Sequence, residues 1–402
     1  MKIFVVLPRF PYPLEKGDKL RAYNQIVHLS RRHEVYLFAL SHHPVDSNAI
    51  AALQPFCREI RVARIRRFVS CKNVLRNFFS TKSLQLGFWD SRSARRACRE
   101  FVRSVNPDVI FNQMVRTIPY VARLPYPKVM DFQDALSMNT ERRMEKTKGL
   151  WHYILHFEFK MLRSTEYNAF KIFDALTIIS PSDRDAIPHR QGRDIHILPN
   201  GVDFDYFNAT EESSNSPIHP FDICFCGNMQ YPPNVDASCY LVNEVMPLVW
   251  KRFPQVRLVL AGATPKAAVR KLASPQVTVT GSVPDIRPYY AQSKLFVAPM
   301  RIGSGLQNKL LEAMSMGVPC VTTSLANEAL HAESGEQLFL GDTPAELAEA
   351  IVRLLTDDAL RQQMAASAAQ FVRQHFSWES VSLQLERILS DAVSNYRPDG
   401  KR

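Results

Sequence analysis

The 402-residue chain contains no long apolar run and no paired cysteine motif, and each absence excludes a class of protein. No apolar segment approaches the roughly 20 residues that a membrane-spanning helix needs. The N-terminal apolar run, residues 3–7, is too short for the apolar region of a signal peptide. The seven cysteines include no CxxC pair, so neither a zinc site nor a disulfide framework is expected. We therefore expect a cytoplasmic protein with reduced thiols.

Acidic residues are scarce in the first half of the chain. Residues 1–200 carry 33 Lys and Arg against 18 Asp and Glu, a net charge of +15, whereas residues 201–402 carry 17 against 21, a net charge of −4. This asymmetry supports two domains and assigns any anionic surface partner to the first. Nucleic acid is not expected, because no recognisable nucleic-acid-binding module accompanies the positive charge.

Short apolar runs alternate with helical patterns along most of the chain. The strands expected in the first half are residues 2–7, 34–40, 59–65, 108–111, 128–132 and 175–180. The strands expected in the second half are residues 221–226, 256–261, 276–280, 294–299 and 318–323. This alternation is typical of α/β proteins and predicts a doubly wound parallel sheet in each half.

The composition between the two series predicts where the domains divide. We expect an N-terminal Rossmann-like domain at residues 1–200, a polar linker at 201–220, a second Rossmann-like domain at 221–375 and a C-terminal helix and tail at 376–402. Two such domains would form a cleft between the carboxyl ends of their strands, which is where open sheets of this kind bind ligands.

Residues 297–323 contain the strongest candidate site, a glycine-rich turn that opens a helix between two strands. The backbone N–H groups of such a turn and the helix dipole favour a bound anion such as a diphosphate. Lys309 lies in the first helical turn, where its charge suits a bound phosphate, and Glu312 lies one turn further on, where a carboxylate can hold a ribose. The alternative is a solvated Lys–Glu ion pair, since the pattern is common in α/β proteins.

Five motifs occur in an order that resembles a known family. They are ILPNGVDFDYF (197–207), FCGNMQYPPNVDA (225–237), VRLVLAGATP (256–265), VTVTGSVPDIRPYY (277–290) and APMRIGSGLQNKLLEAMSMGVPCVTT (298–323). Over residues 197–330 the chain resembles the retaining family-4 glycosyltransferases of the GT-B fold, and the resemblance is thin over the first domain. It implies two doubly wound domains facing across a cleft. It also implies a metal-independent enzyme that transfers a sugar from a nucleoside diphosphate sugar with retention of configuration.

The resemblance implies a set of site residues. Glu312 and Lys309 are the expected catalytic residues, with Glu312 holding the ribose and Lys309 adding positive charge where the leaving diphosphate accumulates negative charge. The expected donor-binding residues are Gly17, Gly227, Asn228, Val283, Asp285, Ser304, Gly305 and Leu306. On the acceptor side we expect Lys19, Arg21, Gln113 and Asp131. For Asp131 a structural helix cap is an equally good interpretation.

The chain departs from the common family pattern at four positions: Gly17 stands alone where paired glycines are usual, Gln113 replaces a histidine, Asn228 an arginine and Ser304 a carboxylate. Because of these departures, the motifs do not identify which sugar is transferred. Two alternatives to a transferase also remain: a catalytically inactive nucleotide-sugar-binding partner subunit and, less favoured, a sugar-nucleotide epimerase. The DxD sequence from Asp203 to Asp205 more often forms a turn than a metal site. No metal and no cofactor are expected.

Basic residues and aromatic residues lie close together in the first half. Arg92, Arg96, Arg99 and Arg103 recur at helical spacing, and a second basic run precedes an aromatic patch made of Phe78, Phe79, Phe88 and Trp89. Such a face suits an anionic membrane surface, although an ordinary solvated surface is the alternative. We therefore expect an enzyme peripherally bound at the inner face of the membrane, acting on a lipid-linked saccharide acceptor in capsule or exopolysaccharide biosynthesis.

Overall fold

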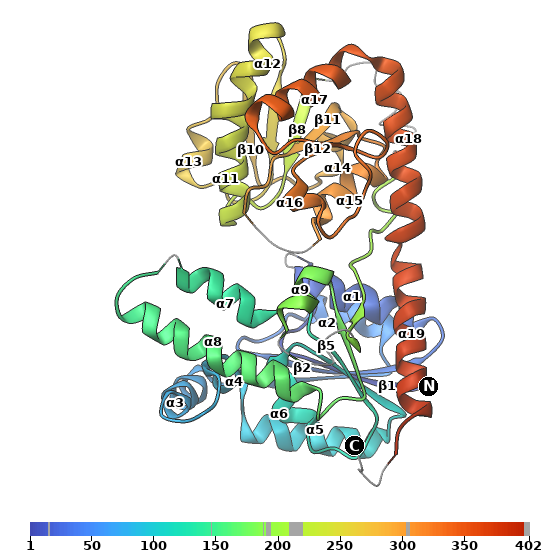
Figure 1. The fold of residues 1–402 in the computed structure, drawn as a ribbon. Helices are drawn as coiled ribbons and strands as arrows, with labels where there is room; N and C mark the ends of the chain where they lie inside the picture. Colours follow the sequence, from blue (N-terminus) through green and yellow to red (C-terminus); the bar gives the residue numbers. More distant parts are fainter. Residues whose placement is uncertain are drawn as a thin grey trace. The chain divides into compact units, whose positions relative to one another are not determined.

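The computed structural model describes residues 1–14, 17–145, 147–187, 189, 194–208, 220–302 and 306–397. The chain forms two compact units (Figure 1). Unit 1 comprises Met1–Pro199 and Val381–Arg402, and unit 2 comprises Asn200–Ser380. Each unit is built around one parallel sheet with helices between successive strands, as the alternating pattern predicts.

Unit 1 contains a seven-stranded sheet in the order β3-β2-β1-β4-β5-β6-β7, with every pair parallel. Its strands are β1 (Lys2–Leu7), β2 (Glu34–Ser41), β3 (Glu59–Arg64), β4 (Val109–Gln113), β5 (Lys128–Asp131), β6 (Ala175–Ile178) and β7 (His196–Ile197). The six predicted strands are confirmed. Strand β7 was not predicted, because two residues are too few to show a period.

The helices of the first 199 residues follow the strands in sequence. They are α1 (Gly17–Ser30), α2 (Ser47–Leu53), α3 (Arg67–Phe78), α4 (Leu84–Trp89), α5 (Arg92–Val105), α6 (Ile118–Val121), α7 (Leu136–Glu145), α8 (Leu150–Ala169) and α9 (Pro181–Ala186). Gly149 has a φ of 68° and precedes α8, so the chain breaks before this helix at a residue whose positive φ favours glycine.

Unit 2 contains a six-stranded parallel sheet in the order β10-β9-β8-β11-β12-β13. Its strands are β8 (Phe221–Cys226), β9 (Leu258–Ala261), β10 (Val277–Gly281), β11 (Ser293–Ala298), β12 (Cys320–Thr322) and β13 (Phe339–Leu340). The five predicted strands are confirmed, and β13 was again too short to predict. Most strand residues are apolar and buried on both faces of each sheet, as expected for parallel sheets that helices cover on both sides.

The helices after residue 220 include the predicted helical tail. They are α11 (Pro232–Tyr240), α12 (Met246–Arg252), α13 (Ala267–Arg270), α14 (Arg287–Ala291), α15 (Asn308–Ser315), α16 (Ser324–Asn327), α17 (Pro344–Thr356), α18 (Asp358–His375) and α19 (Trp378–Ser394). Thr343 and Glu346 form a capping box that starts α17. None of the helices in the described ranges has the length and apolar character needed to cross a bilayer.

The C-terminal part of α19 belongs to unit 1, although it follows unit 2 in sequence. Leu385 and Leu389 are fully buried, and the Glu386 carboxylate accepts hydrogen bonds from Arg32 at 2.8 Å and ion-pairs with His33 at 3.0 Å. Residues that the sequence pattern treats as a separate C-terminal helix therefore complete the first unit.

Candidate functional site

In unit 2 the strand order reverses between β8 and β11, the position at which doubly wound sheets bind ligands. Two glycines bring the loops after β8 and β9 together there. Gly227 has a φ of 156° and Gly262 a φ of 142°, and a Cβ on Gly262 would lie 1.8 Å from the Gly227 carbonyl oxygen. The Gly227 N–H donates to the carbonyl of Ala261 at 2.9 Å. A Cβ at Gly262 would collide with the Gly227 backbone, so glycine is needed there for the two loops to lie this close.

Lys309 on α15 is tied to this loop through Asn234, a residue that the sequence analysis missed. The Lys309 ammonium donates to Asn234 Oδ1, and Asn234 Nδ2 donates to the Asn228 carbonyl at 3.0 Å. Asn234 is buried at the start of α11. In the sequence, only its place as an amide residue in the first turn of a helix points to Asn234. The structure thus brings together three predicted residues, Gly227, Asn228 and Lys309.

The Lys309 ammonium has an unusual electrostatic environment. Burial lowers its pKa to about 8, and the nearby Glu312 carboxylate only partly opposes this. The ammonium also lies 5.1 Å from the centroid of the Phe225 ring. Because its other partners are neutral, a bound anion would favour the charged form of the side chain.

Glu312 is oriented by Tyr290, which is fully buried on α14 and was not predicted. The Tyr290 hydroxyl donates to Glu312 Oε2 at 2.8 Å. Burial raises the pKa of Glu312, and the hydrogen bond from Tyr290 and the charge of Lys309 act in the opposite direction. The second oxygen, Oε1, has no hydrogen-bond partner among the described residues, so this oxygen remains to accept hydrogen bonds from a diol.

Asp285 lies in the loop after β10 together with Val283, but its carboxylate is already engaged. The Arg287 guanidinium pairs with it at 2.6 Å, which lowers the pKa of Asp285, and also lies 4.1 Å from the Tyr206 ring centroid. The side chain of Asp285 therefore holds Arg287 and Tyr206 in place. Val283, in the same loop, is half-buried. Arg287 and Tyr206 were not predicted.

The glycine turn before α15 can be followed only in part. Ser304 and Gly305 lie outside the described residues. Leu306 packs against the core of unit 2, and Gln307 provides no side-chain cap for α15. The Arg301 guanidinium pairs with Asp236 at 2.9 Å and stacks on Tyr240, so an acidic partner already neutralises it.

Within the described ranges, no group of three or more His, Cys, Asp or Glu side chains is arranged to hold a metal ion. Asp203 Oδ1 accepts hydrogen bonds from the N–H groups of Asp205 and Tyr206 at 3.1 and 3.0 Å. The DxD sequence therefore forms a turn, which confirms the interpretation favoured by its sequence context.

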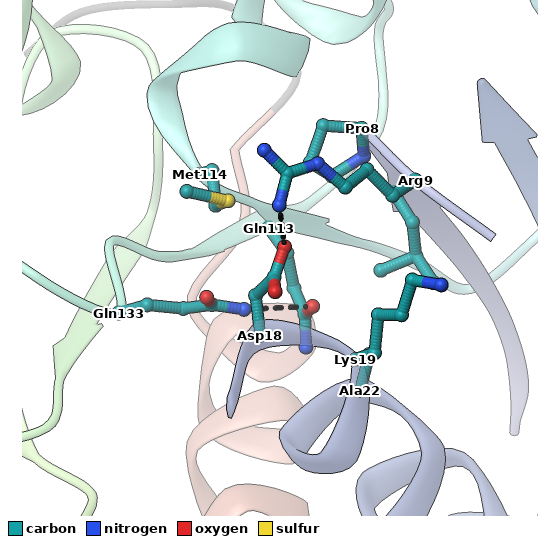
Figure 2. A pocket seen from close by; sticks show the side chains of 9 residues that line it. Pro8, Arg9, Asp18, Lys19, Ala22, Gln113, Met114 and Gln133 are labelled. Atoms are coloured by element: carbon teal, nitrogen blue, oxygen red, sulfur yellow. Dashed lines mark hydrogen bonds and ion pairs between the residues drawn. The ribbon is translucent and has the colours of Figure 1, made fainter. Parts of the chain in front are cut away.

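Unit 1 contains a small pocket at the carboxyl ends of β1 and β4 (Figure 2). It is lined by Leu7, Pro8, Arg9, Asp18, Lys19, Ala22, Gln113, Met114 and Gln133. Arg9 pairs with Asp18 at 2.9 Å across the pocket. Two residues predicted on the acceptor side, Lys19 and Gln113, thus line one pocket, and Gly17 begins the helix that supplies Lys19, with open space where a Cβ would be.

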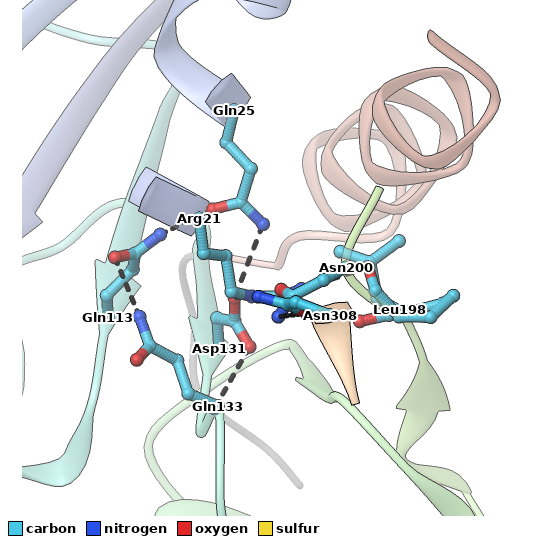
Figure 3. Close-up of polar contacts among 9 residues, drawn as sticks. Arg21, Gln25, Gln113, Asp131, Gln133, Leu198, Asn200 and Asn308 are labelled. Atoms are coloured by element: carbon cyan, nitrogen blue, oxygen red, sulfur yellow. Dashed lines mark hydrogen bonds and ion pairs between the residues drawn. The ribbon is translucent and has the colours of Figure 1, made fainter. Parts of the chain in front are cut away.

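Arg21 and Asp131 form a buried ion pair beside this pocket (Figure 3). Both side chains are 0% exposed, and Arg21 Nε donates to Asp131 Oδ2 at 2.7 Å. The same guanidinium donates to the carbonyls of Leu198 at 2.8 Å and Pro199 at 3.0 Å. Both side chains are buried in this network, and direct contact with an acceptor stays a prediction. In the structure the pair positions α1 against β5.

Three glutamines connect the buried ion pair with the pocket. Gln25 Nε2 donates to Asp131 at 3.3 Å, Gln113 donates to Gln25 Oε1, and Gln133 Nε2 donates to Gln113 Oε1 at 3.1 Å. Gln133 has a φ of 65° and Met114 a φ of 63°, so two non-glycine residues adopt left-handed backbone at neighbouring strand ends. Such strain is concentrated at functional sites. Gln25 and Gln133 were not predicted.

Asp134 follows this network in sequence. Burial raises its pKa to about 7, and the charge of Asp183 adds to the shift. Asp183 itself accepts a hydrogen bond from the Ala135 N–H at 3.2 Å. A carboxyl with this pKa can exchange a proton near neutral pH.

Comparison with known proteins identifies the family. The model for group 1 glycosyl transferases matches residues 220–357, and the model for glycosyltransferase family 4 matches residues 20–206. A Klebsiella pneumoniae protein described as an uncharacterized 44.6 kDa protein in the cps region is 22% identical over 400 residues, 94% of this chain and 97% of its own. The phosphatidyl-myo-inositol mannosyltransferase of Mycobacterium leprae (strain TN) is 27% identical over 212 residues, 51% of this chain and 55% of that one.

Solved structures share the architecture of both units. Anabaena Alr3699/HepE, in complex with UDP, matches with a TM-score of 0.70 at 16% identity, covering 97% of this chain and 100% of that one. The sucrose-phosphate synthase of Thermosynechococcus elongatus matches with a TM-score of 0.69 at 15% identity, covering 98% and 100%. The two family matches together extend over most of residues 20–357, and the chain belongs to the family-4 glycosyltransferases of the GT-B fold.

Proposed function

We propose that this glycosyltransferase moves a sugar from a nucleoside diphosphate sugar, with retention of configuration, to a lipid-linked saccharide acceptor. The observation that carries the donor assignment is the Lys309 ammonium. It is partly buried, it is held by the neutral Asn234, and it lies in the first turn of α15 beside the Gly227 loop. A diphosphate is the anion that such a combination of cation, backbone N–H groups and helix dipole fits.

The proposed donor site assigns a role to each group around this lysine. Lys309 and the backbone of Leu306, with Ser304 and Gly305, stabilise the diphosphate, and Gly227 and Asn228 approach its β-phosphate. Glu312 accepts hydrogen bonds from the ribose through Oε1, while Val283 and Asp285 lie near the base. Gly17 remains among the proposed donor-binding residues.

In the proposed reaction the bond between the anomeric carbon and the β-phosphate oxygen breaks, and its electron pair stays with the diphosphate. The acceptor hydroxyl attacks the same face of the anomeric carbon and transfers its proton to the departing phosphate oxygen. Lys309 stabilises the charge that develops on the diphosphate. We propose that no metal and no further cofactor takes part.

The acceptor is proposed from unit 1. Lys19 and Arg9 line its small pocket and can hydrogen-bond saccharide hydroxyls, and Gln113 lies buried in the wall of the pocket with its amide bonded to Gln25 and Gln133. The relative in a cps region and the mannosyltransferase named for phosphatidyl-myo-inositol support an acceptor that is a lipid-linked saccharide in capsule or exopolysaccharide biosynthesis. We propose a cytoplasmic enzyme that binds the anionic inner face of the membrane.

A donor panel tests the proposal. Purified protein is incubated with UDP-, GDP-, ADP- and dTDP-sugars, with and without EDTA, and both the melting temperature and slow donor hydrolysis are measured. One donor that stabilises the protein and is hydrolysed regardless of EDTA is the expected result. Stabilisation without any turnover, even with added acceptor lipids, would favour a catalytically inactive nucleotide-sugar-binding partner subunit. Absence of any response would overturn the donor assignment.

A further inference from the structure

Helix α3 departs from the usual amphipathic arrangement, because two of its polar residues are buried while large apolar residues are exposed. Ser70 and Asn77 are buried on its inner face. Asn77 Nδ2 donates to the Ser83 carbonyl and Asn73 Nδ2 donates to the Asp90 carbonyl, both at 2.8 Å. The buried Ser70 Oγ and Asn77 Oδ1 have no hydrogen-bond partner among the described residues, so the inner face of α3 is only partly paired, while Phe68 and Leu75 lie outside the core.

The outer surface of α3 continues onto the start of α8. Phe78 at the end of α3 contacts Phe157 on α8 at 5.8 Å between ring centroids. Helical spacing places Phe157, Tyr153 and Leu150 on one face of α8. Six large apolar side chains on these segments are each between 63% and 80% exposed: Phe68, Leu75, Phe79, Leu150, Trp151 and Tyr153. These six residues form the α3–α8 surface.

The inner side of α8 makes a polar contact in its first half as well. The buried Glu158 carboxylate accepts hydrogen bonds from the Ser83 hydroxyl at 2.7 Å and from the Leu84 N–H at 2.6 Å. Both helices are thus attached to α4 by polar contacts and present apolar side chains outward. Exposed apolar patches of this extent are rare on monomeric proteins and mark interaction sites.

The charge around the surface identifies its partner. Between Glu59 and Asp90 the chain carries seven Lys or Arg residues and no Asp or Glu. Four of these cations lie exposed along α3 or directly before it: Arg66, Arg67, Lys72 and Arg76. Long cationic side chains around apolar and aromatic groups match the interface of an anionic bilayer, where apolar groups enter the acyl region and cations meet the headgroups.

We propose that the α3–α8 surface is the part of the enzyme that inserts into an anionic lipid bilayer. This inference rests on the proposed lipid-linked acceptor, because insertion would bring unit 1 to the membrane in which such an acceptor lies. It also separates two faces that the sequence analysis joined. Arg92, Arg96 and Arg99 are exposed on α5, but none of the exposed large apolar side chains belongs to that fully described helix. Helix α5 attracts the bilayer without inserting.

The test uses the whole chain and two vesicle compositions, phosphatidylcholine alone and an equal mixture of phosphatidylcholine and phosphatidylglycerol. The wild type is expected to sediment with the mixed vesicles only. A triple variant, Phe68→Gln, Leu75→Gln and Phe79→Gln, is expected to lower the partition coefficient about tenfold or more. The control variant, Leu325→Gln with Leu383→Gln, removes exposed leucines elsewhere and is expected to partition as the wild type.

Charge and insertion are measured separately. Replacing Arg67, Lys72 and Arg76 by Gln is expected to lower partitioning about fivefold per cation on the mixed vesicles. Trp151 fluorescence, obtained by difference from Trp151→Phe, is expected to shift to shorter wavelength on binding. Equal partitioning of the triple variant and the wild type would overturn the proposal, as would a wild-type dimer that the triple variant dissociates. Nucleotide binding, measured without vesicles, keeps failure of this surface distinct from failure of the transferase assignment.

Discussion

Burial lowers the pKa of the Lys309 ammonium to about 8, so the proposed binding of a nucleoside diphosphate there should depend on pH. Below the pKa the side chain is charged and suits a diphosphate, and above it a proton must be taken up on binding. The affinity for the nucleoside diphosphate selected by the donor panel should therefore be constant near pH 7. It should fall as the pH rises through 8, by at most tenfold per pH unit. Calorimetric titrations at pH 7, 8 and 9 measure this.

The variant Lys309→Met supplies the control for that titration. It should weaken binding at pH 7 by about 1.5–3 kcal/mol, the usual contribution of a hydrogen bond to a charged group, and remove the decline between pH 7 and 9. If the wild type bound equally well at pH 7 and pH 9, Lys309 would not contact the diphosphate.

Glu312 and Tyr290 permit binding and stability to be separated. Glu312→Ala should weaken nucleotide binding by about 1–3 kcal/mol and should also lower the free energy of unfolding by about 1–3 kcal/mol, because the buried Tyr290 hydroxyl loses its acceptor. Adding Tyr290→Phe should restore most of the stability and none of the binding. Calorimetry and urea denaturation distinguish the two effects. Unchanged binding in Glu312→Ala would remove this carboxylate from the ribose site.

Among the elements of unit 1, helix α1 depends on the buried Arg21–Asp131 pair for its attachment. Arg21→Leu leaves the Asp131 carboxylate buried without its cation and frees the carbonyls of Leu198 and Pro199. We expect this change to lower the free energy of unfolding by about 3–5 kcal/mol. The double variant Arg21→Leu with Asp131→Leu should recover part of the loss, since no unpaired charge remains. Urea denaturation of both variants measures this, and a single variant as stable as the wild type would contradict the positioning role.

At the scale of the whole molecule, the last helix should stabilise the first unit. Leu389 on α19 is fully buried in unit 1, so Leu389→Ala should lower stability by about 2–5 kcal/mol. Hydrogen exchange should show the lost protection in β1 and α1 rather than in the strands of unit 2. Leu354→Ala, a fully buried leucine on α17, is the matched control and should have the opposite distribution. Equal loss in both units would mean that the two unfold as one.

Local patterns in the sequence were sufficient for the sheets and for placing part of the proposed donor site on a turn and a helix. Buried strands are continuous apolar runs and helices repeat every 3.6 residues, so eleven strands could be located from short windows. Lys309 and Glu312 could be placed because a glycine turn and a helix put them one turn apart. The two-residue strands β7 and β13 escaped, since their position is set by pairing with a neighbouring strand.

Contacts between distant residues were decided only by the tertiary structure. Asn234 reaches Lys309 across 75 positions and Arg21 reaches Asp131 across 110, and no local pattern encodes such a pair. The outward apolar face of α3 has a helical period like any other, and only packing shows which face is buried. The sequence by itself determined the alternation of elements and the chemistry of one turn, because both are set by neighbouring residues. The partners of the buried polar groups and the return of α19 to unit 1 depend on which segments the folded chain brings together.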